Sequence, residues 1–104
     1  MARNPRVVGY HSITIAATSG SIITLGSITK TGAMKSFVGV LESGQVRARG
    51  DGTAATATAG QLIEIGQTVI LSENDLENMQ FIRTGGASGV LNGHTYDAEF
   101  DVMG

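Results

Sequence analysis

Two histidines are the side chains of this sequence best suited to catalysis. His11 and His94 lie far apart in the chain, and no local motif, such as the G-x-S-x-G turn, fixes a nucleophile for them. Histidines in such a context are usually exposed or hydrogen-bonded in a core. A cupin-like enzyme would need a histidine cluster, and the sequence has none. It therefore predicts no enzyme activity, no metal site, no cofactor and no small-molecule substrate.

Three carboxylates alternate near the end of the sequence, at Asp97, Glu99 and Asp101. On one face of a strand they can contribute to a Ca²⁺ site, because hard cations take several oxygen ligands. No neighbouring loop supplies the remaining ligands. A charged face also discourages strands from pairing edge to edge. We interpret the three as a solvated face, and any binding role for them stays open.

Three arginines, Arg47, Arg49 and Arg83, flank the middle of the chain. Arginine is favoured at interfaces, so they can pair with carboxylates of a partner, or internally with Asp51. Arg49-Gly50-Asp51 also spells the tripeptide associated with integrin ligands. An Asp in a glycine-flanked turn has a structural use too, because it hydrogen-bonds its own backbone. Both readings remain open.

The composition indicates one small domain, residues 1–104, of 104 residues with a net charge of −2. Residues 1–5 are expected to form a short flexible arm, which either makes no specific contact or docks on a neighbouring subunit. The absence of cysteine excludes disulfides and thiolate metal sites. The slight negative charge argues against neutralising nucleic-acid phosphates, and the apolar runs are too short for a membrane span. We also expect no secretory signal.

Short apolar runs between turn signals predict an all-β fold, an antiparallel sandwich of jelly-roll type with about eight strands. Phe37–Leu41 is apolar on both faces, which suits a central strand or a strand with one face in a subunit interface. In the next strand Val46 and Ala48 should face the core. The other expected strands are 6–17, with Ile13 and Ile15 on one face, 22–25, 62–65, 68–71, 79–83 and 96–102, whose strict alternation predicts a half-buried strand.

The connections are predicted from their turn chemistry. Residues 42–45 and Gly66-Gln67 read as hairpin turns, and Asn92-Gly93 is the strongest two-residue turn signal. Residues 53–59 have small side chains and suit an edge strand or a loop lying flat on another surface. Ser72-Glu73-Asn74-Asp75 has the form of a capping box, so at most one helical turn is expected, near Ser72–Met79.

The stretch 45–86 resembles a family of small β-sandwich virion proteins of tailed bacteriophages. Gly50 stands where that pattern has a larger residue, and Ala55 where it has proline. The resemblance covers about 40 of the 104 residues. The residues that carry it are Arg47, Arg49, Asp51, Gly52, Thr53, Thr56, Gly60, Gly66, Asn78, Phe81, Ile82, Arg83 and Gly85.

The resemblance implies a structural role in a virion, as a capsid decoration (cement) or minor capsid protein made in the bacterial host cytoplasm and placed on the head. It implies contacts with itself, as a trimer first of all, and with the major capsid protein. Few aromatic residues and a thin core also favour an oligomer. A tail or fibre component, or a receptor- or carbohydrate-binding module, is the alternative. The interface candidates are Phe37, Val38, Val40, Arg47, Arg49, Thr53, Thr56 and Arg83.

Overall fold

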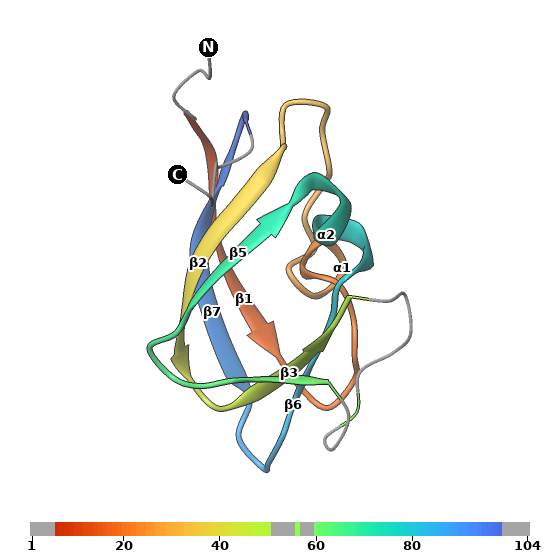
Figure 1. Ribbon diagram of the computed structural model, residues 1–104, viewed down its shortest axis with the longest axis vertical. Helices are drawn as coiled ribbons and strands as arrows, with labels where there is room; N and C mark the ends of the chain where they lie inside the picture. The colour runs from red at the N-terminus through yellow and green to blue at the C-terminus, as the bar shows by residue number, and fades with distance from the viewer. Residues whose placement is uncertain (1–5, 51–55, 57–59, 99–104) are drawn as a thin grey trace.

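The computed structural model describes residues 6–50, 56 and 60–98, and these fold into two antiparallel sheets packed face to face (Figure 1). The larger, sheet A, has the strand order β1-β7-β2-β5, and the smaller, sheet B, has the order β4-β3-β6. The arrangement is sandwich-like and mostly β, as the sequence predicts, with seven strands among the described residues. The elements are β1 (Val7–Ile15), α1 (Ile22–Leu25), β2 (Ser36–Ser43), β3 (Val46–Arg49), β4 (Gln61–Ile63), β5 (Thr68–Ser72), α2 (Glu73–Asn78), β6 (Gln80–Arg83) and β7 (Gly89–Tyr96).

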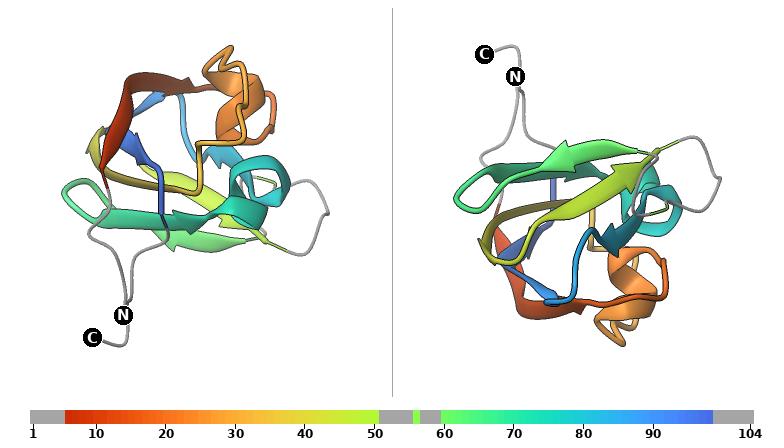
Figure 2. Two further views of the ribbon diagram at one scale, coloured as in Figure 1. Left: turned by 90° about the horizontal axis from the view of Figure 1, so that it is seen from above. Right: turned by 90° about the horizontal axis from the view of Figure 1, so that it is seen from below.

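The core lies between the two sheets, with both short helices on one side of it (Figure 2). Its two largest fully buried side chains are Phe37 from sheet A and Phe81 from sheet B. Ile13 and Ile15 of β1 are also fully buried, which confirms the face predicted for them. In β7 buried and half-buried residues alternate along the whole strand. Such alternation is typical of a sheet with one face in the core and the other towards solvent.

The centre of sheet A contains a pair of facing glycines. The predicted turn at Asn92-Gly93 is wrong, because both residues lie inside β7, where Gly93 is directly opposite Gly39 of β2. A Cβ atom on Gly93 would lie 2.3 Å from the carbonyl oxygen of Val38 and 2.8 Å from the Phe37 ring. Glycine is therefore needed at this position for close packing of backbone and ring, not for a turn.

The strand predicted at residues 22–25 is instead the helix α1. The Ser21 hydroxyl accepts a hydrogen bond from the Thr24 backbone N–H, so this serine is an N-cap. The N–H of Gly26 closes the turn on the carbonyl oxygen of Ile22. Four residues are too few for their hydrophobic pattern to distinguish a helix from a strand, and capping decides the outcome here.

Two predicted hairpins are also wrong, because each turn joins strands of different sheets. Residues 44–45 lead from β2 in sheet A to β3 in sheet B, and Gly44 has a φ of +69°. The turn at Gly66 exists, with the Gln67 N–H donating to the Glu64 carbonyl oxygen, but it leads from β4 to β5. The chain thus crosses between the sheets at these points and does not return along the same sheet.

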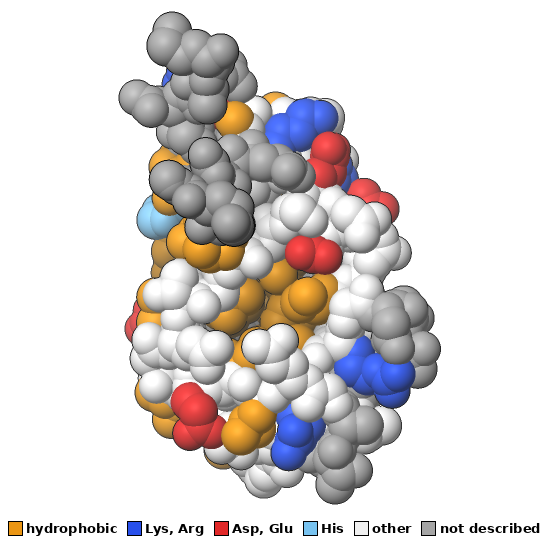
Figure 3. All heavy atoms as spheres, in the orientation of Figure 1, with side chains coloured by type: hydrophobic (Ala, Val, Ile, Leu, Met, Phe, Trp, Pro, Cys, Tyr) orange, Lys and Arg blue, Asp and Glu red, His pale blue; other side chains and the backbone are white. Residues whose placement is uncertain are grey.

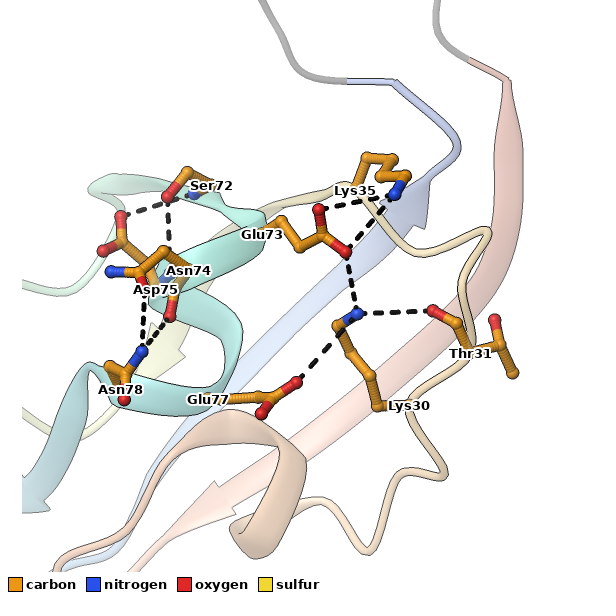
Figure 4. A network of polar contacts seen from close by, with 9 residues as sticks. All are labelled: Lys30, Thr31, Lys35, Ser72, Glu73, Asn74, Asp75, Glu77 and Asn78. Carbon is orange, nitrogen blue, oxygen red and sulfur yellow. Dashed lines mark hydrogen bonds and ion pairs between the residues drawn. The ribbon is translucent and has the colours of Figure 1, made fainter.

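The predicted capping box is confirmed at the start of α2. The Ser72 hydroxyl accepts from the Asp75 N–H, and the Asp75 carboxylate accepts from the Ser72 N–H. Glu73 of the same helix also forms ion pairs with two lysines of the segment between α1 and β2 (Figure 4). Glu73 Oε2 lies 3.0 Å from Lys30 Nζ and 3.4 Å from Lys35 Nζ. These hydrogen bonds, that of Lys30 first, hold the pKa of Glu73 below its ordinary value.

The strand predicted at 96–102 is not found in the described residues. β7 ends at Tyr96, and residues 99–104 lie outside the described part. Asp97 instead joins the start of β1, because its N–H donates to the Arg6 carbonyl oxygen and its carboxylate accepts from the Arg6 N–H. In the described part of the chain, neither helix is long and apolar enough to cross a membrane.

Candidate interaction surface

The surface of sheet A that faces away from the core, called the outer face here, has at its centre a row without acidic, lysine or arginine side chains. Tyr10, His94, Val38 and Ile70 are direct neighbours on the four successive strands, so their side chains share one face. Ser12, Asn92, Val40 and Thr68 form the next row in the same way. Tyr10 is 60 % exposed and Ile70 is 48 % exposed. Large side chains are therefore open to solvent at both ends of this row, on the two edge strands of the sheet.

Three aromatic rings lie together on the outer face. The ring centroids of Tyr10 and His94 are 5.2 Å apart, and those of His94 and Tyr96 are 6.4 Å apart. Both pairs are tilted, the arrangement that the ring quadrupoles favour. The rings border a shallow hollow of about 350 Å³ that also contacts Val40, Glu42 and Asn92. Within the described residues the Oδ1 atom of Asn92, one of the residues that border the hollow, is buried and has no hydrogen-bond partner.

The two histidines point to opposite faces of sheet A. His94 pairs with Tyr10 on the outer face, whereas His11 pairs with Gly93 and lies on the inner face. His11 Nε2 is 3.2 Å from the hydroxyl oxygen of Thr95, which is buried. Burial, and secondly the proximity of His94, lowers the pKa of His11. Among the described residues no three His, Asp or Glu side chains gather as metal ligands would.

The predicted interface candidates are distributed over different parts of the molecule. Phe37 is fully buried in the core of the domain, so its side chain is not available to a subunit interface. Val38 and Val40 belong to the outer face of sheet A. Thr56 is exposed, whereas Thr53 lies outside the described residues.

The three arginines do not form one group. Arg47 and Arg49 alternate with the buried Val46 and Ala48, as predicted, and therefore face away from the core. Arg47 Nη1 donates to the carbonyl oxygen of Gly60 at 2.9 Å. Arg83 instead pairs with Val46, so it has the register of the core-facing side, at the end of β6. Asp51, Glu99 and Asp101 lie outside the described residues, so the tripeptide and the acidic row have no described geometry.

Sequence reasoning missed Tyr10, Ile70, His94 and Tyr96 as members of one surface. Alternation within each strand places every one of them on a face, but their assembly into a row depends on strand order and register. These properties are set by pairings between distant residues.

Comparison with known proteins gives no relative for this chain. No protein-family model matches it, no curated protein is significantly similar in sequence, and no solved structure is significantly similar in fold. The class that the fold itself defines is an antiparallel two-sheet sandwich with a row of Tyr10, His94, Val38 and Ile70 across the outer face of its larger sheet.

Proposed function

We propose that this domain is a structural protein of a tailed-bacteriophage virion, a capsid decoration or minor capsid protein that works through protein–protein contacts and carries out no reaction. The observation that carries the protein–protein role is the central row Tyr10, His94, Val38 and Ile70. The centres of protein interfaces are poor in charged residues and rich in aromatic ones. The virion, its head surface, the trimer and the capsid partner come from the sequence resemblance.

The outer face is small for a protein interface. Four strands about 4.8 Å apart and five paired residues at about 3.4 Å each give a face of roughly 19 by 17 Å, or about 320 Å². A standard interface buries about 800 Å² on each partner. A single contact through this face is therefore weak, and a shell that offers many sites compensates by avidity. A particle component fits this requirement.

Val40→Asp and Leu62→Asp form a matched pair that tests the role of the outer face. Val40 is 37 % exposed on the outer face of sheet A, and Leu62 is 38 % exposed on sheet B. Either aspartate costs the isolated domain about 1 kcal/mol or less. At an interface, an unpaired charge costs several kcal/mol. We expect Val40→Asp to abolish binding to purified capsids in a co-sedimentation assay and Leu62→Asp to leave it intact.

Light scattering on the wild-type chain accompanies this test. A folded monomer that also fails to bind purified capsids contradicts the decoration role. Equal loss of binding in both aspartate variants contradicts the assignment to the outer face.

A receptor- or carbohydrate-binding role is the second candidate, and the aromatic hollow favours it. Sugar rings pack on aromatic side chains, and Tyr10, His94 and Tyr96 border one shallow hollow. A glycan array distinguishes the two candidates. Saturable glycan binding that Tyr10→Ala removes, without binding to capsids, would establish the second candidate in place of the first.

A further inference from the structure

The sandwich is open on the side where β5 and β4 form the edges of their sheets. Between them lies a groove of about 210 Å³ whose apolar wall comes from Val69 and Leu71 of β5, Ala48 of β3, Ile63 of β4 and Met79. Figure 3 shows apolar side chains (orange) at the bottom of a hollow near the centre of this face. The opposite side is closed, because Phe81 and Gly20 exchange two backbone hydrogen bonds. Among the described residues, the groove therefore lies on the side of the sandwich away from this bridge.

The edge of β5 that borders this groove is free to pair with another strand. β5 is the last strand of sheet A in the described residues. The Leu41 N–H donates to the Gln67 carbonyl oxygen, which sets the alternation of the ladder between β2 and β5. By this alternation Val69 and Leu71 bond to β2, whereas the backbone groups of Thr68 and Ile70 point to the free edge. Proteins usually protect such an edge with charges or proline, and β5 has neither.

A segment with the pattern of a missing strand occurs in the same sequence. Residues 97–102 alternate Asp97, Glu99 and Asp101 with Ala98, Phe100 and Val102. One face of a strand with this pattern is apolar and suits the groove, and the other is acidic and suits water. β7 ends before this segment, at Tyr96.

We propose that the groove between β4 and β5 binds residues 99–102 of a second copy of this chain as an added strand. The added strand pairs with the free edge of β5 and places Phe100 over the apolar wall of the groove, a mode of recognition known as strand addition. This proposal uses a different surface from the outer face and does not depend on the virion role. It gives the copies a way to link to one another.

The same copy cannot supply this strand. The Ala98 carbonyl oxygen accepts a hydrogen bond of 2.8 Å from the Ser36 hydroxyl. Ser36 shares the face of Val38, so Ala98 lies on the outer face of sheet A, whereas the buried residues of β5 line the groove from the inner face. A strand added outside β5 lies two strand spacings from β2, or about 10 Å. Phe100 follows Ala98 by two residues, which span at most about 7 Å. Phe100 in the groove must therefore come from another copy.

A labelled peptide tests the groove directly. A fluorescein-labelled peptide with the sequence of residues 96–103 is titrated with the full-length chain and followed by fluorescence anisotropy. We expect a saturable rise. The control peptide has Phe100 and Asp101 interchanged, which keeps composition and charge but moves the ring to the other face of a strand. We expect it to bind at least about tenfold more weakly. Equal binding of the two peptides overturns the proposal.

Two protein variants locate the peptide. Thr68→Pro removes an N–H at the free edge without removing a bond to β2, and proline is tolerated at the first residue of a strand. We expect it to weaken peptide binding at least about tenfold, whereas Val40→Asp leaves binding unchanged. The reverse result assigns the peptide to the outer face and overturns the proposal. If circular dichroism shows that Thr68→Pro is unfolded, the comparison of the native and the interchanged peptide alone decides whether the groove binds this segment.

Sedimentation velocity tests the second copy. The wild-type chain should associate as its concentration rises towards the dissociation constant of the peptide, and Phe100→Asp should remain monomeric. A wild-type chain that stays monomeric in this range while the peptide binds overturns the assignment to a second copy. Because Phe100→Asp leaves the outer face intact, binding of this variant to capsids reports separately on the virion role.

Discussion

Gly93→Ala is expected to destabilise the domain strongly, because the centre of sheet A has no space for a methyl group. The added Cβ would lie 2.3 Å from the Val38 carbonyl oxygen and 2.5 Å from the Gly39 Cα. Both atoms belong to the backbone of β2, so a rotation of the Phe37 ring cannot relieve the clash. Contacts under 3.0 Å require the strands to move apart where they carry the core.

The size of this effect follows from the cost of overpacking. Inserting a methyl group into a packed core costs about 1–3 kcal/mol, and the backbone clash places Gly93→Ala at about 3 kcal/mol or above. For a domain of this size, 1 kcal/mol corresponds to about 4–8 °C in Tm. We therefore expect Tm to fall by about 12 °C or more in thermal unfolding followed by circular dichroism.

Gly32→Ala is the matched control for this measurement. A Cβ at Gly32 would meet no atom within 4 Å, so its effect should stay within about 0.5 kcal/mol. A loss below about 1 kcal/mol in Gly93→Ala would refute the reasoning. It would show that β2 and β7 can separate at little cost, and that the close approach of Gly39 and Gly93 is not a rigid feature of the core.

Three further predictions concern the cap of α2 and two titrating groups. Ser72→Ala removes the N-cap acceptor of the Asp75 N–H and should cost about 1 kcal/mol in urea unfolding; an unchanged midpoint would contradict the capping box. Burial, and secondly the proximity of His94, lowers the pKa of His11, so His11 binds a proton more readily in the unfolded chain than in the folded one. The unfolding free energy should therefore fall as the pH drops below about 6.5. Unfolding free energies at pH 7.5 and 5.5 should differ less in His11→Gln than in the wild type. The hydrogen bonds from Lys30 and Lys35 lower the pKa of Glu73, so this carboxylate stabilises the fold above the ordinary glutamate pKa and loses that effect as the pH falls below it. Glu73→Gln should therefore reduce the loss of unfolding free energy at acid pH. An unchanged loss would contradict this explanation.

Local patterns predicted the elements whose structure depends on neighbouring residues. Alternation found β1 and its buried Ile13 and Ile15, and the capping box found the start of α2, because both signals act within a few residues. Residues 22–25 have a short apolar pattern that suits strand and helix equally. There the hydroxyl of Ser21 and the packing of Ile22 in the core decide for a helix.

Pairing between distant residues explains the remaining errors. Asn92-Gly93 has the composition of a turn, but Gly93 is required by Gly39 and Phe37, which lie far away in sequence. The turn at Gly66 was located correctly, whereas its partner strands were not, since the sheet that each strand joins depends on the whole core. The outer face was missed for the same reason, because its central row requires the register of all four strands of sheet A.

The position of β7 determines when sheet A can form. β7 is the last described strand in the sequence, yet it lies between β1 and β2, the first two. A ribosome releases the chain from the N-terminus, so β1 and β2 have no common neighbour until Gly89–Tyr96 has emerged. Pairings of such long sequence separation form late and slowly, in milliseconds to seconds. Until then Ile13 and Phe37 remain exposed to wrong partners, so the core cannot be completed before β7 has been synthesised.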